Sequence, residues 1–194
     1  MGKDLRGAIS SCTLRAEIIP FTMKKEARPA AVNRKGAGAM GSDTLQSVID
    51  LAIQKEEEAY NFYMNLRNNV EDKSAKDTLK YLADEEADHK SFLVKCKEQM
   101  SCDIVLRPDM PVDYKVAENL KQPDIQKNMN SEEVFLVAAA RELYAHNFYK
   151  GLAELCPKGP VKELLLRMAN EEMRHKEKME YLYSNTAFAQ TAGG

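Results

Sequence analysis

The chain has 194 residues, of which 30% are charged, and a formal net charge of −2. This length suits one domain with a sizeable core, and the slightly acidic balance argues against a nucleic-acid interface on the body of the protein. No segment approaches the roughly 20 apolar residues that span a bilayer, and no signal peptide is evident, so we expect a cytoplasmic protein without membrane contact. The four cysteines form no C-x-x-C pair, which excludes four-cysteine iron and zinc sites.

The first 41 residues differ in composition from the rest of the chain. Residues 1–40 carry a net charge of +5, contain Pro20 and Pro29, and lead into a glycine-rich stretch over residues 36–41. No helical stripe of apolar residues persists there, so residues 1–41 are predicted to be a flexible or extension segment. A targeting extension and a later start at Met40 are the alternatives. A folded domain is expected over residues 42–186, followed by a frayed C-terminus over 187–194.

Apolar residues at helical spacing predict four long helices in the rest of the chain. Capping residues, prolines and glycines set their expected limits at about residues 42–70, 74–100, 131–155 and 161–183. Ser131 is the expected N-cap of the third helix, because two glutamates follow it.

The connections between these helices are short, long and short. The middle one, over about residues 101–130, can run back along a helix of about 25 residues, which is roughly 38 Å long. Helices two and three would then be parallel, and a short helix or turn is expected within the connection. The sequence therefore predicts an all-α, ferritin-like four-helix bundle with one long crossover between helices 2 and 3.

The same signature occurs twice in the chain, 86 residues apart. The pattern E-x-x-A-x-x-F-Y begins at Glu56 and again at Glu142, and E-x-x-H begins at Glu86 and again at Glu172. Each of these residues falls inside an apolar stripe, and the i,i+3 spacing places each histidine on the same helix face as its glutamate. Four glutamates and two histidines should therefore point towards one interior.

Such a cluster is stable only if positive charge compensates it, because a buried carboxylate costs several kcal/mol. Four carboxylates around two divalent cations balance to about zero charge. Carboxylate and imidazole ligands suit iron or manganese, so we expect two iron ions, with manganese or a mixed pair as the alternative. The predicted metal ligands are Glu56, Glu86, His89, Glu142, Glu172 and His175. The competing interpretation is that these six residues are incidental surface charges and that the repeat records duplication alone.

Several neighbouring side chains could assist the site. Tyr60 and His146 occupy equivalent positions in the two halves and are candidates for hydrogen bonding to a ligand or to bound oxygen species. His146 could also be a third histidine ligand. Tyr63 and Tyr149 are predicted to be core residues that hydrogen-bond across the bundle, and Glu85 is expected to lie at the surface or behind the ligands.

With these motifs, residues 43–184 resemble the rubrerythrin-like branch of the ferritin-like superfamily. The resemblance implies that Glu56 and Glu142 are terminal carboxylate ligands and that Glu86 and Glu172 are bridging carboxylates. It also implies that His89 and His175 are the imidazole ligands. Full-length rubrerythrins also carry a rubredoxin domain that delivers electrons, and this chain has none. They place a further carboxylate on the third helix, where this chain has Ala145. The six-ligand set looks closer to a bacterioferritin ferroxidase centre.

The expected function is that of an oxidoreductase which reduces hydrogen peroxide or oxygen in oxidative-stress defence. A separate electron-donor protein would then be needed, and we expect a homodimer. The first alternative is a ferroxidase-type or non-catalytic protein that binds and handles iron. The second is an interaction module that uses its basic tail. A substrate hydroxylase is a further option, although nothing in the sequence marks an organic substrate pocket.

Overall fold

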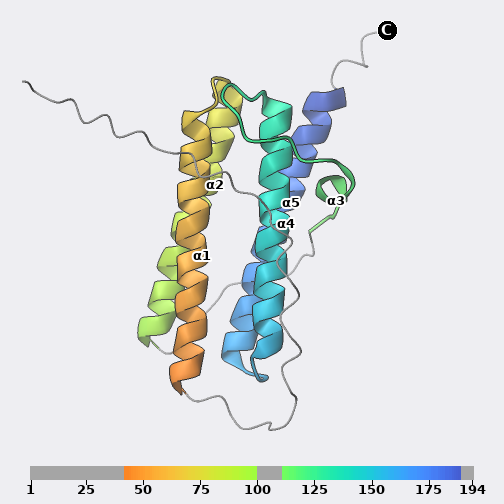
Figure 1. Ribbon diagram of the computed structural model, residues 1–194. Coiled ribbons are helices and arrows are strands. Elements are labelled where there is room, and N and C mark those ends of the chain that lie inside the picture. Colours follow the sequence, from red (N-terminus) through yellow and green to blue (C-terminus); the bar gives the residue numbers. More distant parts are fainter. Residues whose placement is uncertain (1–41, 100–110, 189–194) are drawn as a thin grey trace, which may run out of the picture. The chain divides into compact units, whose positions relative to one another are not determined.

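The computed structural model describes residues 42–99 and 111–188, which belong to one compact unit. The predictions made for residues 1–41 and 189–194 lie outside this range. Four long helices and one short helix form the described part of the chain (Figure 1). They are α1 (Ser42–Asn68), α2 (Lys73–Gln99), α3 (Val116–Asn119), α4 (Ser131–Leu155) and α5 (Pro160–Phe188).

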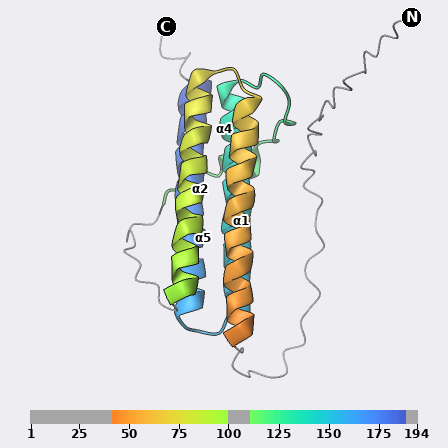
Figure 2. The same ribbon diagram turned by 90° about the vertical axis from the view of Figure 1, so that its left-hand side faces the viewer.

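The long helices pack as two antiparallel hairpins, α1 against α2 and α4 against α5 (Figures 1 and 2). Helices α2 and α4 run in the same direction, so the chain must return along the bundle between them. The short helix α3 lies in this return segment and contacts α4. The predicted all-α, ferritin-like four-helix bundle with a long crossover is confirmed. Within the described residues, no helix has the length and apolar character needed to cross a membrane.

The start of α4 is fixed by a capping box. The side chain of Asn130 accepts a hydrogen bond from the Glu133 amide at 2.9 Å, and the Glu133 carboxylate accepts one from the Asn130 amide at 3.0 Å. This reciprocal pair satisfies two of the free amides at the helix end. The prediction that Ser131 caps the helix was wrong by one residue, because its hydroxyl donates instead to Asp72 at 2.7 Å.

The end of the crossover is attached to the loop between α1 and α2. Val70 and Met129 form an isolated parallel β-bridge, and both side chains are buried. The Asn128 amide also donates to the Asn69 carbonyl at 2.8 Å. Asn128 has a φ of 62°, in the left-handed region that asparagine tolerates better than most residues. These contacts fix where α4 begins relative to the first hairpin.

Two apolar clusters fill the bundle on either side of its middle. One includes Leu79, Phe135 and Met179 from three different helices, near the end where α1 meets α2. The other includes Leu93 and Leu165, near the opposite end. Both consist of fully or nearly fully buried side chains that stabilise the bundle by removing apolar surface from water. The polar residues predicted to bind metal lie in the layer between them.

A buried dimetal-type carboxylate centre

Each of the four long helices contributes to a polar layer in the middle of the bundle. The glutamates come one from each helix, and α2 and α5 each add a histidine one turn after the glutamate. All four glutamates are at most 2% exposed. The histidines are nearly as buried, with side-chain exposures of 15% for His89 and 5% for His175. The structure thus brings together all six side chains that the sequence singled out.

These side chains form two groups that could each hold a metal ion. The groups are Glu56, Glu86, His89 and Glu172, and Glu86, Glu142, Glu172 and His175. In each group the ligand atoms all lie within 4.8 Å of one another. Glu86 and Glu172 belong to both groups, while every other member belongs to one. Exchanging each member for its counterpart 86 residues away in the other half of the chain turns the first group into the second, so the sequence repeat appears as a pseudo-twofold arrangement.

The two imidazoles lie side by side at the centre of the layer. Their ring centroids are 5.3 Å apart and their planes differ by 13°. The Nδ1 atom of His89 is 3.6 Å from an oxygen of Glu56 and 3.6 Å from one of Glu172. The Nδ1 atom of His175 is 3.6 Å from an oxygen of Glu86. These distances exceed normal hydrogen-bond lengths, so the groups face one another without bonding directly.

Several polar atoms of this layer have no hydrogen-bond partner among the described residues. Both carboxylate oxygens of Glu86 and Glu172 and the Nδ1 atoms of His89 and His175 are in this state, although all are buried. Buried polar atoms in proteins are normally paired, because leaving one unpaired costs about 1–3 kcal/mol. Oxygen and imidazole donors converging on two points are also the donors that iron and manganese prefer. The residues therefore fit a pair of divalent metal ions.

The protonation of the cluster reflects its burial and its crowding of acids. Burial and the neighbouring Glu86 raise the pKa of Glu56 to about 8. Burial and two negative neighbours also raise the pKa of Glu172 well above its usual value. Burial opposes ionisation of Glu86, but the carboxyl of Glu56 and the two imidazoles hold its pKa well below the usual value. Burial alone would lower the pKa of both imidazoles, yet the surrounding carboxylates raise it well above the usual value.

Two tyrosines orient the carboxylates that are not shared between the groups. The Tyr63 hydroxyl on α1 donates to Glu142 on α4, and the Tyr149 hydroxyl on α4 donates to Glu56 on α1. This confirms the prediction that both tyrosines hydrogen-bond across the bundle. Burial and the adjacent carboxylate raise the pKa of each phenol well above its usual value, so both remain neutral donors. Such outer contacts fix the direction in which a ligand presents its oxygens.

The other neighbours occupy different positions. His146 lies with Nδ1 2.7 Å from the carbonyl oxygen of Ala169 on α5, and it belongs to neither group of candidate ligands in the described chain. Burial lowers the pKa of His146, which favours the neutral ring with Nδ1–H donating to that carbonyl. Tyr60 packs, partly buried, against the apolar cluster near the α1–α2 loop. Glu85 lies 3.7 Å from Nε2 of His175, on the side of the ring away from the cluster.

Sequence reasoning missed a cavity that reaches the cluster between α1 and α4. Its volume is about 10 Å³, and Glu56, Glu86 and Glu172 form part of its wall. Two cations, Lys55 and Arg141, line the same cavity. A volume of this size holds about one water molecule. The sequence did carry a signal for these cations, because they too are 86 residues apart.

A second cluster of charges, around the buried Lys176 and Glu180, was also missed. Carboxylate oxygens of Asp113, Glu118 and Glu180 lie close enough together to suggest a cation site. However, Nζ of Lys176 lies among them, 2.9 Å from Glu180 and 3.1 Å from Glu118. The lysine supplies the compensating charge there. In the central cluster, in contrast, the oxygens of Glu86 and Glu172 and the Nδ1 atoms of both histidines have no hydrogen-bond partner among the described residues.

Comparison with known proteins gives the family. No curated protein matches the chain in sequence. A solved structure of a hypothetical protein from Pyrococcus furiosus is similar, with a TM-score of 0.49 and 22% identity, covering 74% of this chain and 90% of that chain. The rubrerythrin family model matches residues 20–130 and 133–190, which is most of the chain. The chain therefore belongs to the rubrerythrin family.

Proposed function

We propose that this protein is a di-iron carboxylate oxidoreductase that reduces hydrogen peroxide or oxygen. One observation carries the proposal: two buried Glu/His groups share Glu86 and Glu172, and the donor atoms of the shared residues have no other partner in the described chain. A manganese pair or a mixed pair would use the same donors.

The residues have distinct roles in this proposal. Glu86 and Glu172 would bridge the two ions, because each belongs to both groups. Each ion would also take one unshared glutamate and one histidine, which are Glu56 with His89 and Glu142 with His175. The hydroxyls of Tyr63 and Tyr149 hold the unshared carboxylates in position.

Two ferrous ions bound there would supply the two electrons that, with two protons, convert hydrogen peroxide to two water molecules. The apolar clusters on either side keep bulk water away from the layer. The cavity admits a molecule of about the size of water, which favours peroxide or oxygen over an organic substrate. The electrons would be replaced by a separate donor protein, since the chain has no C-x-x-C pair for an iron site of its own.

Metal content and peroxide consumption test this proposal together. The protein should bind about two metal ions per chain, as in other carboxylate sites that hold two metals. The reduced form should consume about one peroxide per chain, because two ferrous ions supply the two electrons that one peroxide needs. Glu86→Ala should lose both metal ions and His89→Ala the one ion of its own group, and neither variant should consume peroxide. Glu57→Gln is the matched control, because Glu57 neighbours a ligand but points to solvent and pairs with Lys90. A wild-type protein that binds no iron or manganese would refute the proposal.

Ferroxidase-type iron handling is the second candidate, and one observation favours it. Ala145 lines the cavity at the position where the resemblance to rubrerythrins places a further carboxylate. A six-ligand site of this kind is closer to that of a ferroxidase. Under this alternative, ferrous iron itself would be the substrate, and iron uptake would exceed two ions per chain without an added electron donor. Uptake that stops at two ions would favour the peroxidase-type function.

A further inference from the structure

Two cations, one on α1 and one on α4, each contact an aromatic ring on the other helix. Nζ of Lys55 on α1 lies 5.6 Å from the centroid of the Phe148 ring on α4. Cζ of Arg141 on α4 lies 5.6 Å from the centroid of the Phe62 ring on α1. At such distances a cation is attracted to the face of an aromatic ring. Both the cations and the rings are 86 residues apart, so each contact is the pseudo-symmetric copy of the other.

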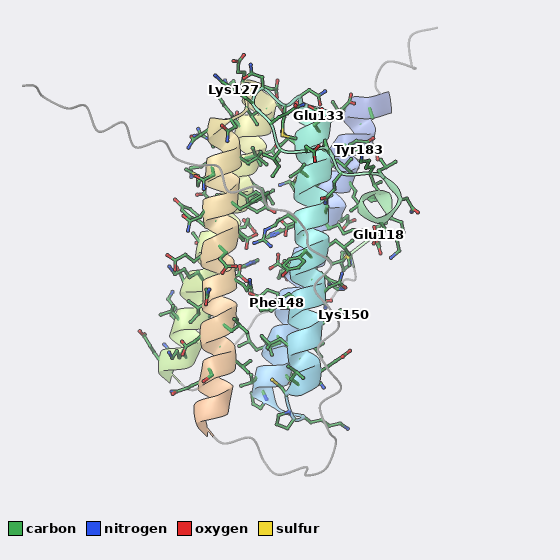
Figure 3. The ribbon with its side chains drawn as sticks, in the orientation of Figure 1. Glu118, Lys127, Glu133, Phe148, Lys150 and Tyr183 are labelled. Carbon is green, nitrogen blue, oxygen red and sulfur yellow. The ribbon has the colours of Figure 1, made fainter. Side chains whose placement is uncertain are left out.

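These cations lie beside the buried carboxylate layer. Lys55 and Arg141 both line the cavity that reaches Glu56, Glu86 and Glu172. Each cation directly precedes a glutamate of the cluster in sequence. Figure 3 shows Phe148, a further wall residue, between α1 and α4. Arg141 is only 8% exposed, and the Lys55 side chain is 25% exposed, so the charges lie within the wall of the cavity.

The two halves differ in what surrounds each cation. Glu58 lies 2.6 Å from Nζ of Lys55 and offsets part of its charge. The position equivalent to Glu58 in the second half is Tyr144, whose ring centroid is 5.8 Å from Cζ of Arg141. The guanidinium of Arg141 therefore contacts two aromatic rings, and Glu58 attracts it more weakly than it attracts Lys55. The cavity should be more positive on the Arg141 side.

Electrostatics then decide which small molecules pass this point. Charges in the low-dielectric wall of a narrow cavity focus the field and change association rates by about 10- to 1,000-fold. Here Lys55 and Arg141 share the wall with three glutamates, so the two cations oppose the negative field that the glutamates alone would produce. Positive charge attracts anions and opposes divalent cations. Uncharged hydrogen peroxide and oxygen are unaffected by the sign of the field, and the cavity already limits the size of what enters.

We propose that Lys55 and Arg141 form a paired cationic gate that admits small neutral or anionic oxidants to the carboxylate layer and slows access of divalent metal ions through this face. The gate rests on the proposed function, because it presupposes a metal site behind it. A purely structural role for the two cations, holding α1 against α4, is the competing explanation. The two explanations differ in whether probes of opposite charge respond in opposite directions.

The decisive experiment compares one cationic and one anionic probe in Lys55→Met, Arg141→Met and the double variant. Methionine keeps much of the side-chain volume and removes the charge. Loading of Co²⁺ into the metal-free protein is followed by stopped-flow absorbance, and azide binding is followed on the oxidised iron-loaded protein. At low ionic strength the double variant should load Co²⁺ about tenfold faster and bind azide about tenfold more slowly. Both differences should shrink at about 0.5 M salt, where charges are screened.

Two controls separate charge from structure. The exchange Lys55→Arg with Arg141→Lys preserves both charges and should keep both rates near the wild-type values. Lys80→Met removes an exposed cation on α2, paired with Asp84 and remote from this wall, and should change neither rate. If the double variant does not fold, Lys55→Met alone carries the same test at a more exposed position.

The outcomes also distinguish a failure of the proposed gate from a failure of the proposed function. If wild type and variants all bind two Co²⁺ ions but the two rates do not move in opposite directions, the gate is wrong and the metal site stands. Rates that fall together would indicate the structural role. If the wild-type protein binds no Co²⁺, both the proposed function and the gate are wrong.

Discussion

The tyrosine hydroxyls contribute to the site at the scale of single residues. A buried carboxylate that is to bind a cation must keep one oxygen free while its orientation is held by the other. A neutral donor does this without competing for the cation's charge, whereas a lysine would neutralise the carboxylate outright. Tyr63 and Tyr149 fit this requirement, because both are buried and each donates to one oxygen of an unshared glutamate.

Removing either hydroxyl should therefore weaken metal binding. Tyr63→Phe should loosen Glu142, and Tyr149→Phe should loosen Glu56, each lowering the affinity of one of the two metal ions by about 10- to 100-fold. Competition with a chelator for Mn²⁺ measures this directly. Tyr181→Phe is the control, because Tyr181 is 56% exposed. Unchanged affinities in both tyrosine variants would show that the hydroxyls serve packing alone.

The sequence predicted the residues of the central layer because their spacing is local. An i,i+3 pair on a helix, or a glutamate inside an apolar stripe, is visible without knowing how the helices pack. Arg141 and Lys176 were missed for the opposite reason. A charged residue in a helix is usually solvated, and only the packing of α1 against α4, or of the crossover against α5, shows that these two are buried. His146 occupies a position equivalent to Tyr60, but its ring bonds to the α5 backbone.

At the scale of elements, the crossover is attached to α5 by a partly buried charge network. The carboxylate of Glu180 accepts hydrogen bonds from the backbone amides of Tyr114, at 3.1 Å, and Ala117, at 2.9 Å. Nζ of Lys176, one turn earlier, bonds to the same carboxylate and to Asp113 and Glu118. Glu118 is a residue of α3 and is labelled in Figure 3. Lys176 and Glu180 have no measurable exposure, so each depends on the other for its charge compensation.

Lys176→Met should strongly destabilise the protein. Removing one partner of a buried ion pair leaves an uncompensated charge and costs about 3–5 kcal/mol of unfolding free energy. Urea denaturation measures this loss, and hydrogen exchange at the amides of Tyr114 and Ala117 should become faster. Combining Lys176→Met with Glu180→Gln removes the stranded charge and should recover part of the loss.

Lys80→Met provides the comparison for this element. Lys80 and Asp84 form an i,i+4 pair with side-chain exposures of 48% and 57%, so its loss should cost at most about 0.5 kcal/mol. If Lys176→Met were as mild as Lys80→Met, the network would not hold the crossover. The sequence could not reveal this network in full, since Asp113 and Glu118 lie in a segment whose path depends on tertiary contacts.

At the scale of the whole molecule, the two hairpins repeat each other's side-chain contacts as well as each other's sequence. The bonds from Tyr63 to Glu142 and from Tyr149 to Glu56 are copies of each other, as are the cation–ring contacts of Lys55 and Arg141. Even the Phe–Tyr ring pairs that follow each first glutamate have the same geometry, 5.3 Å and 72°. Each hairpin thus supplies three residues of one group and one residue of the other, and neither hairpin contains a complete group.

This sharing predicts how metal binding should fail in variants. Glu56→Gln and Glu142→Gln should each lose one Mn²⁺ ion per chain, because each glutamate belongs to one group. Glu86→Gln and Glu172→Gln should lose both, because each belongs to both groups. Binding to the native state also raises unfolding free energy, by about 2.7 kcal/mol per site at a metal concentration 100 times Kd. Thermal unfolding with and without Mn²⁺ should therefore show about half of the wild-type stabilisation in the first pair of variants and almost none in the second.

Exposed acids next to the ligands serve as controls for that series. Glu57→Gln should retain both Mn²⁺ ions and the full stabilisation, because Glu57 points to solvent and pairs with Lys90 at 3.2 Å. The shared-carboxylate arrangement would be contradicted if Glu86→Gln lost one ion only, or if Glu56→Gln lost both. In the first case the two positions would be independent and would have to be held by separate glutamates. In the second, the unshared carboxylates would couple the two hairpins as strongly as the shared ones do, through their cross-bundle bonds to the tyrosines.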